Sequence, residues 1–337
     1  RGIEIDVAKL SSLLGVPVGI TFVEGANIGY LVSQAADMVQ RLHYNAAVAR
    51  GPISLGPDAA FAQINIRGAG GIKVPTGVII GDDSVMVVEA QATPRLAQKV
   101  IDCIRSVTDK PISHVVLTHY HAVRVLGASA FGAPQIIMSE AARNMVAERG
   151  QEDWDSEFQR FPRLFQGHES IPGLTWPTTT FNGKMTVWLG RRRVDLLQLG
   201  RAHTAGDAVI HVPDQNVMFT GDIVEAHSAC YCGDGYFADW GATLEAIRAY
   251  DLDAIAPGRG DAVVGRAAVN AALDRTRDFV ESTFRPVARV AARNGSLKEA
   301  WEACRAECDP KFRDYAIYEH CLPFNVARAY DEARGIS

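Results

Sequence analysis

Two histidines, His119 and His121, directly follow an apolar run and constrain the fold more than any other feature of the sequence. The run predicts a buried strand over residues 112–117. Side chains two positions apart at a strand end point to the same side, so both imidazoles can reach one cation. The chain has nine histidines, and an isolated His-x-His pair is therefore weak evidence until other segments support it.

The composition narrows the class of protein and its partners. The chain has 337 residues, of which 47% are hydrophobic and 22% charged, enough for a large core. A net charge of −5 without a basic stripe argues against a nucleic-acid partner. No apolar run approaches the roughly 20 residues of a membrane-spanning helix, so we expect no membrane span.

The six cysteines follow no metal-binding or redox spacing. Scattered cysteines favour a reducing compartment, and we expect a cytoplasmic protein. A periplasmic location is the alternative if a leader was removed before Arg1.

Two β-rich blocks, each followed by helices, organise the chain. Strands are expected over 62–66, 77–80 and 84–89, and again over 178–181, 185–189, 194–199, 208–212 and 217–220. Residues 139–149 predict a helix, and the charged and aromatic stretch 150–175 predicts a separate helical insertion over a site. We expect an α/β, four-layer αββα sandwich over 56–265, an N-terminal helical extension over 1–55 and a C-terminal helical region over 266–337.

Three later motifs support the histidine pair. The segment Gly-Arg-Ala-His-Thr-Ala-Gly-Asp at 200–207 places His203 in a glycine-bounded loop. Thr-Gly-Asp at 220–222 places Asp222 at the end of a predicted strand, and Pro-Gly-Arg-Gly at 257–260 places Arg259 in a tight turn. Taken in this order, the motifs resemble those of the metallo-β-lactamase superfamily over residues 60–265. The resemblance implies a sandwich with a metal site at one edge of its two sheets.

The resemblance also implies roles for individual residues. His119, His121 and His203 correspond to the three imidazoles of the family's first metal site, and Asp222 corresponds to the carboxylate that bridges two metals. The expected set of metal ligands is therefore these three histidines with Asp222.

The sequence departs from the family pattern at the second metal site. Val123 and Arg124 stand where the family has aspartate and histidine, and Arg259 replaces a later histidine. Valine has no donor atom and arginine has no lone pair to offer a metal. We therefore predict a degenerate second site and one divalent metal ion per chain, with Zn²⁺ favoured and Fe²⁺ as the alternative.

These residues predict a metal-dependent hydrolase that cleaves an ester, lactone, amide or thioester bond of a small anionic organic substrate. Asp222 would bind the metal or orient the attacking water as the catalytic general base. Arg124 and Arg259 would clamp the substrate's anionic group, or pair with nearby acids and neutralise the pocket. Tyr236, in a glycine-rich loop, is a candidate for substrate contact, with packing as the alternative.

Two other functions fit the same residues. Mononuclear non-haem iron at the first site would give an oxygen-dependent enzyme. A metal-free, decayed site would leave a non-catalytic binding or assembly subunit. The aromatic residues of the C-terminal region are also compatible with a homodimer interface.

Overall fold

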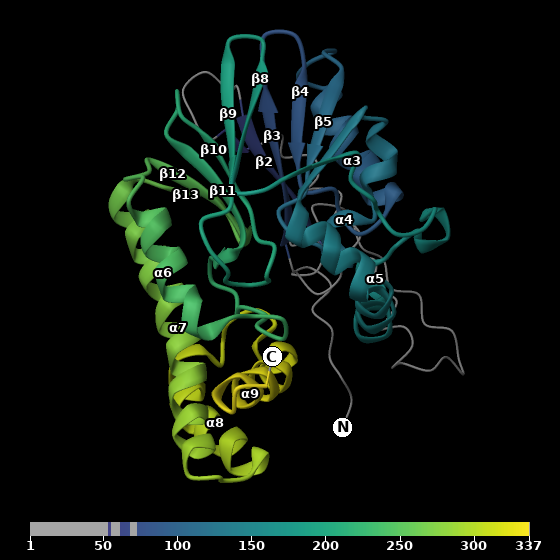
Figure 1. Ribbon diagram of the computed structural model, residues 1–337. Helices are drawn as coiled ribbons and strands as arrows, with labels where there is room; N and C mark the ends of the chain where they lie inside the picture. Colours follow the sequence, from purple (N-terminus) through teal and green to yellow (C-terminus); the bar gives the residue numbers. More distant parts are fainter. Residues whose placement is uncertain (1–52, 55–60, 68–72, 337) are drawn as a thin grey trace, which may run out of the picture. The chain divides into compact units, whose positions relative to one another are not determined.

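Two β-sheets pack against each other in the computed structural model, with helices on their outer sides (Figure 1). The structure describes residues 53–54, 61–67 and 73–336. These ranges belong to one compact unit, Pro52–Ser337. The N-terminal helical extension predicted over 1–55 lies outside the described residues, except for 53–54, which form a strand.

The first sheet has strand order β1-β2-β3-β4-β5-β6-β7 within the described chain. Pairs from β1 to β4 are antiparallel, whereas β4 to β7 run parallel. The strands are β1 (Ile53–Ser54), β2 (Phe61–Arg67), β3 (Lys73–Ile80), β4 (Val85–Val88), β5 (Ile112–Val116), β6 (Gln135–Ser139) and β7 (Thr179–Phe181).

The second sheet is also mixed, with order β13-β12-β11-β10-β9-β8. Only β11 and β12 pair in parallel among its described strands. The strands are β8 (Lys184–Leu189), β9 (Arg192–Leu197), β10 (Val209–Val212), β11 (Val217–Glu225), β12 (Ala254–Arg259) and β13 (Val263–Val264).

Several helices begin at a residue whose side chain caps the first turn. Thr93 accepts the Leu96 N–H before Pro94, and Ser296 forms a capping box with Glu299. The described helices are α3 (Pro94–Arg105), α4 (Ala122–Val125), α5 (Glu140–Arg160), α6 (Phe237–Arg248), α7 (Arg266–Ala292), α8 (Leu297–Phe312) and α9 (Tyr318–Ala333), with short 3₁₀ turns at Ala128–Phe131, Pro162–Leu164 and His168–Ser170.

Alternating side chains of the second sheet enter two different cores, as the two-residue period of a strand requires. Leu196, Ile210 and Phe219 pack between the sheets with Val88 and Val116 of the first sheet. Their neighbours on the opposite face pack under the C-terminal helices: Leu197, Val209, Met218 and Ile255 join Trp240, Leu273, Cys304 and Leu322. The predicted α/β sandwich with a C-terminal helical region is thereby confirmed.

One helix differs from the sequence prediction. α5 continues through Gly150 to Arg160, whereas the sequence predicted a helix ending at 149 and a separate insertion. Tertiary contacts explain the extension, because Asp153 and Glu157 in its second half accept the backbone N–H groups of Ala122 and Val123. The extended helix therefore contacts the loop that carries the histidine pair.

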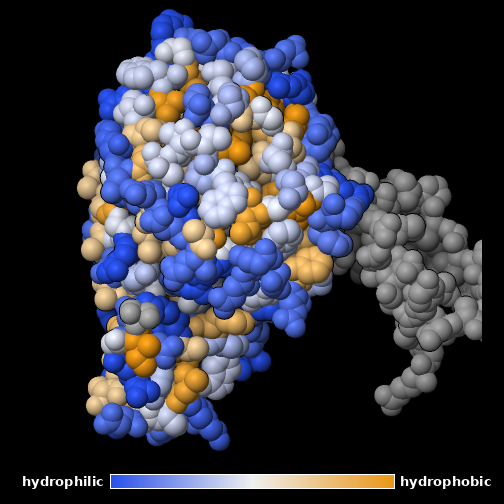
Figure 2. Space-filling model, turned by 45° about the vertical axis from the view of Figure 1, so that its right-hand side comes forward, coloured by the Kyte–Doolittle hydropathy of each residue, from blue (hydrophilic) through white to orange (hydrophobic). Residues whose placement is uncertain are grey.

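None of the described helices is both long and apolar enough to cross a bilayer, as predicted. On the face shown in Figure 2, hydrophobic residues lie scattered among hydrophilic ones. The homodimer remains a prediction.

Candidate metal centre

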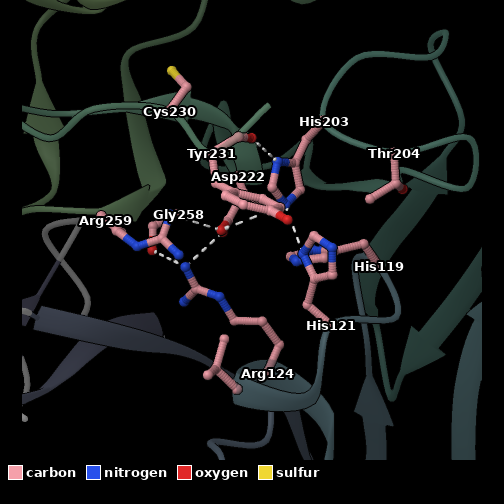
Figure 3. A network of polar contacts seen from close by, with 12 residues as sticks. His119, His121, Arg124, His203, Thr204, Asp222, Cys230, Tyr231, Gly258 and Arg259 are labelled. Carbon is pink, nitrogen blue, oxygen red and sulfur yellow. Dashed lines mark hydrogen bonds and ion pairs between the residues drawn. The ribbon is translucent and has the colours of Figure 1, made fainter. Parts of the chain in front are cut away.

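Three imidazoles converge at the edge of the two sheets (Figure 3). His119 and His121 follow β5, and His203 lies in the loop between β9 and β10. One ring nitrogen from each lies within 4.8 Å of the others, and all three side chains are buried. The sequence prediction that these histidines lie together is therefore met by the fold.

The protein holds the outward-facing nitrogens of His119 and His203. His203 Nδ1 donates to the Tyr231 carbonyl at 2.8 Å, and His119 Nδ1 lies 2.8 Å from Thr118 Oγ1. His119 Nε2 is buried without a hydrogen-bond partner in the described chain. Burial lowers the pKa of His203 to about 3 and keeps the pKa of His119 well below its usual value. Both rings are therefore held neutral with a lone pair available.

His121 is oriented by a buried carboxylate. Its Nε2 donates to Asp234 at 2.8 Å, while its Nδ1 lies 2.9 Å from His203 Nε2. Burial alone would lower the pKa of His121, but Asp153 and Asp234 raise it to about 9. Asp234 is itself fixed by the Tyr120 hydroxyl at 2.8 Å and by Arg149 at 2.7 Å. Asp234 thus aims His121 Nδ1 at the other two rings.

A second group of donor atoms shares His121 with the first. His121, Asp153 and Asp234 form a second set close enough to hold an ion. Asp234 already accepts hydrogen bonds and an ion pair, and Asp153 accepts the Ala122 N–H. In this structure the two carboxylates orient His121 and the loop that carries it.

Asp222 lies between the imidazoles and two arginines (Figure 3). Its Oδ2 is 3.8 Å from His203 Nε2. Arg124 Nη2 donates to Asp222 Oδ1 at 2.6 Å, and Arg259 Nη1 lies 3.0 Å from Asp222 Oδ2. Burial would raise the pKa of Asp222, but the two guanidiniums outweigh it and hold the pKa well below its usual value. Asp222 is therefore an anion at any working pH.

Glycines let the strands approach closely here. A Cβ at Gly258 would lie 2.3 Å from Asp222 Oδ1, and a Cβ at Gly221, whose φ is +53°, would lie 2.5 Å from Thr118 Oγ1. Neither position tolerates a larger residue without movement of its neighbour. The Thr-Gly-Asp and Pro-Gly-Arg segments thus bring Asp222 to the imidazoles and to Arg124.

The predicted substrate-binding residues lie in different surroundings. Arg124 is fully buried and also donates to the Gly258 carbonyl at 2.6 Å. The cavity beside it has a volume of about 20 Å³, room for one water molecule. Tyr236 lies between Arg201 and Arg328, whose guanidinium carbons are 4.2 and 5.4 Å from the ring centroid. Arg259 alone of the three lines a large cavity among those described.

Sequence reasoning missed the acids that support His121. Asp234 lies in the Gly-Asp-Gly stretch of the glycine-rich loop from which Tyr236 was selected, and Asp153 and Glu157 lie in the stretch assigned to an insertion. The helical spacing of Asp153 and Glu157, which places both on one face of α5, was a usable signal.

The two packed sheets and the three converging imidazoles define an α/β sandwich with a candidate metal site at the edge of its sheets. A family model described as the metallo-beta-lactamase superfamily matches residues 69–259. The chain belongs to the metallo-beta-lactamase superfamily, as the sequence motifs predicted.

Individual relatives are distant. The linear primary-alkylsulfatase of Pseudomonas sp. (strain ATCC 19151) is 24% identical over 241 residues, which cover 62% of this chain and 44% of that protein. The metallo-beta-lactamase type 2 of Bacillus sp. (strain 170) is 22% identical, over 56% of this chain and 68% of its own. A solved metallo-beta-lactamase from Pontibacter korlensis superposes with a TM-score of 0.52 at 16% identity, covering 64% of this chain and 94% of that one.

Proposed function

We propose that the chain is a hydrolase that works with one divalent metal ion, with zinc favoured, held by His119, His121 and His203. The observation that carries this proposal is the arrangement of the ring nitrogens. Three of them face one another, while the outer nitrogens lie against Thr118, Asp234 and the Tyr231 carbonyl. Metal-binding histidines typically have their second nitrogen held in this way.

The positions of Arg124 and Arg259 favour a single metal ion over two. Both oxygens of Asp222 already lie within 3.0 Å of a guanidinium nitrogen. A second dication against the same carboxylate would meet two fixed positive charges. Val123 contributes no donor atom. We propose that Arg124 and Arg259 take the place of the family's second metal.

A bound divalent ion would supply an acidified water molecule and polarise a carbonyl or related group. Asp222, with its low pKa, is a weak proton acceptor. We therefore assign it to charge balance and to metal or water orientation, and not to proton abstraction. Arg124 fixes Asp222, and the partly exposed Arg259 is the arginine able to contact an anionic substrate.

The substrate class proposed is a small organic anion with an ester, lactone, amide or thioester bond. The relative named as an alkylsulfatase supports an anionic ester within this class. Activity assays with a panel of such anionic compounds, each compared with its neutral counterpart, would identify the substrate class.

Metal analysis tests the proposal directly. Elemental analysis of chain purified without oxygen is expected to give about one zinc per chain. His119→Ala should lose the metal, whereas His168→Ala, an exposed histidine paired with Glu169, should retain it. A value near two metals per chain would contradict the single site. Iron with substrate-dependent oxygen uptake would contradict the hydrolase.

A further inference from the structure

A cavity of about 530 Å³ lies beside Arg259, outside the cluster of imidazoles. The loop after β11, the turn between β12 and β13, and helix α7 border it. The volume falls within the usual range of small-molecule sites. None of the three histidines lines it.

The two edges of the Arg259 guanidinium have different surroundings. Its Nη1 lies 2.6 Å from Glu225 Oε1 and 3.0 Å from Asp222 Oδ2. Its Nε and Nη2 form no hydrogen bond with a described residue, and the side chain is 13% exposed while lining the cavity. The inner edge is thus neutralised, and the outer edge keeps free donors.

A second arginine lines the same cavity. Arg275, on α7, is half-buried and forms neither a hydrogen bond nor an ion pair with the described part of the chain. A half-buried guanidinium without a partner is a candidate contact for an anionic ligand. Asp261, the acid among the lining residues, is exposed.

His227 and Ser228 also line the cavity, and the rest of its wall is apolar and made of small side chains. Ala226, Ala262, Val263, Ala268 and Ala316 contribute to it. A ligand for such a space would combine an anionic group with an apolar body. The planar donor edges of two guanidiniums match a carboxylate or another oxyanion.

We propose that this cavity is a binding site for a small organic oxyanion, with Arg275 and the outer edge of Arg259 as the anion contacts. None of the three histidines lines the site, and Arg259 connects it to the candidate metal centre through Asp222. Binding here requires neither a metal ion nor turnover, so the site stands or fails independently of the proposed hydrolase.

Calorimetric titration with benzoate tests the site. The full chain, both zinc-loaded and chelator-treated, should bind benzoate with similar affinity. Benzamide lacks the charge and acetate lacks the ring, so both should bind more weakly. Arg275→Gln should weaken benzoate binding about tenfold or more, as expected for loss of a charged hydrogen bond. Arg289→Gln, an exposed arginine of the same helix outside the cavity, is the matched control and should bind as the wild type does.

Two results would overturn the proposal. Equal affinity for benzoate and benzamide would exclude anion recognition, and unchanged benzoate binding by Arg275→Gln would place the anion elsewhere. His119→Ala separates the two proposals, because it should lose metal but keep benzoate binding. Benzoate binding that disappears with the metal would assign the anion to the imidazole cluster instead.

Discussion

Asp222 forms ion pairs with two guanidiniums, and a metal held by the three imidazoles would add further positive charge near it. Buried charges are costly unless paired, and both guanidiniums pair with Asp222. Arg124 keeps its Nε and Nη1 buried without partners in the described chain. Its Nη2 contacts Asp222 in β11 and the Gly258 carbonyl in β12.

Arg124→Gln should lower the free energy of unfolding of the metal-free chain by about 3–5 kcal/mol, because it leaves a buried carboxylate with one partner fewer. Urea unfolding followed by circular dichroism measures the change. Arg285→Gln removes an exposed helical pair with Glu281 and should cost less than about 0.5 kcal/mol. Equal effects of the two variants would contradict the role assigned to Arg124.

Asp234→Asn should weaken zinc binding about 10- to 100-fold, because His121 loses the carboxylate that orients it. Competition with a chromogenic chelator measures the affinity. Asp239→Asn is the control, since Asp239 pairs with Arg201 at the surface and should leave the affinity unchanged. Unchanged affinity in the Asp234 variant would mean that the three rings are positioned without it.

Glu89 predicts a pH dependence of stability. Burial raises its pKa from 4.5 to about 7, although Arg124 and Thr118 act in the opposite direction. A raised carboxyl pKa means that the folded chain binds the proton more tightly. The contribution of Glu89 to the free energy of unfolding is therefore complete below about pH 4.5. It is lost as the pH rises through about 7, and the loss is at most roughly 3 kcal/mol.

Glu89→Gln should remove this decline in the unfolding free energy of the metal-free chain between pH 4.5 and 7. The measurement is urea unfolding across that range. Identical pH profiles for the variant and the wild type would show that Glu89 is not the titrating group.

At the scale of elements, the paired strands β11 and β12 carry Asp222 and Gly258 at the candidate metal centre. Gly258→Ala should displace Asp222, since its Cβ would lie 2.3 Å from Oδ1. We expect a loss of about 1–3 kcal/mol in stability, together with weaker metal binding. Thermal unfolding and chelator competition measure both effects.

Gly241 in α6 offers the opposite case, because a Cβ there meets nothing within 4 Å. Gly241→Ala should raise stability by about 0.5–1 kcal/mol through helix propensity. A loss of stability in this control would show that close approach is not what distinguishes the two glycines.

Most strands were predictable from the sequence, because apolar runs and the glycines after them are local signals, although β11 continues to Glu225, beyond its predicted end at 220. His119 and His203 could therefore be brought together by the fold class alone. The partners of these histidines could not be predicted in the same way. Asp234 reaches His121 across 113 residues, and nothing in its own neighbourhood in the sequence marks it as a partner. The length of α5 was also missed, because the charged and aromatic stretch after 149 predicted a separate insertion, whereas tertiary contacts continue the helix.

On the scale of the whole molecule, the C-terminal helices share a core with the second sheet. The strands end at Val264 and α7 begins at Arg266, so the predicted boundary at 265/266 falls between two elements. That boundary remains a prediction as a division between domains.

Asn325 connects α9 to the metal centre. Its Oδ1 accepts the Cys232 N–H at 2.7 Å and its Nδ2 donates to the Cys230 carbonyl at 2.9 Å. These contacts flank Tyr231, whose carbonyl accepts from His203. The C-terminal region thus fixes one side of the imidazole cluster from a distance in sequence.

Asn325→Ala should lower stability by about 1–3 kcal/mol, because it leaves buried backbone groups unpaired. It should also weaken zinc binding, although Asn325 contacts none of the three histidines. Thermal unfolding and chelator competition on the same samples measure both. Full zinc affinity at reduced stability would show that the helix supports the fold without positioning His203.

The positive charges of the two arginines beside Asp222 belong to side chains of the protein itself. Neither a chelator nor a shortage of metal can remove them. In a centre that needs two ions, the loaded fraction at low supply depends on the square of the free metal concentration. With Arg124 and Arg259 in place of one ion, it would depend on the first power. Such a protein would stay partly loaded at metal concentrations that would leave a two-ion centre almost empty.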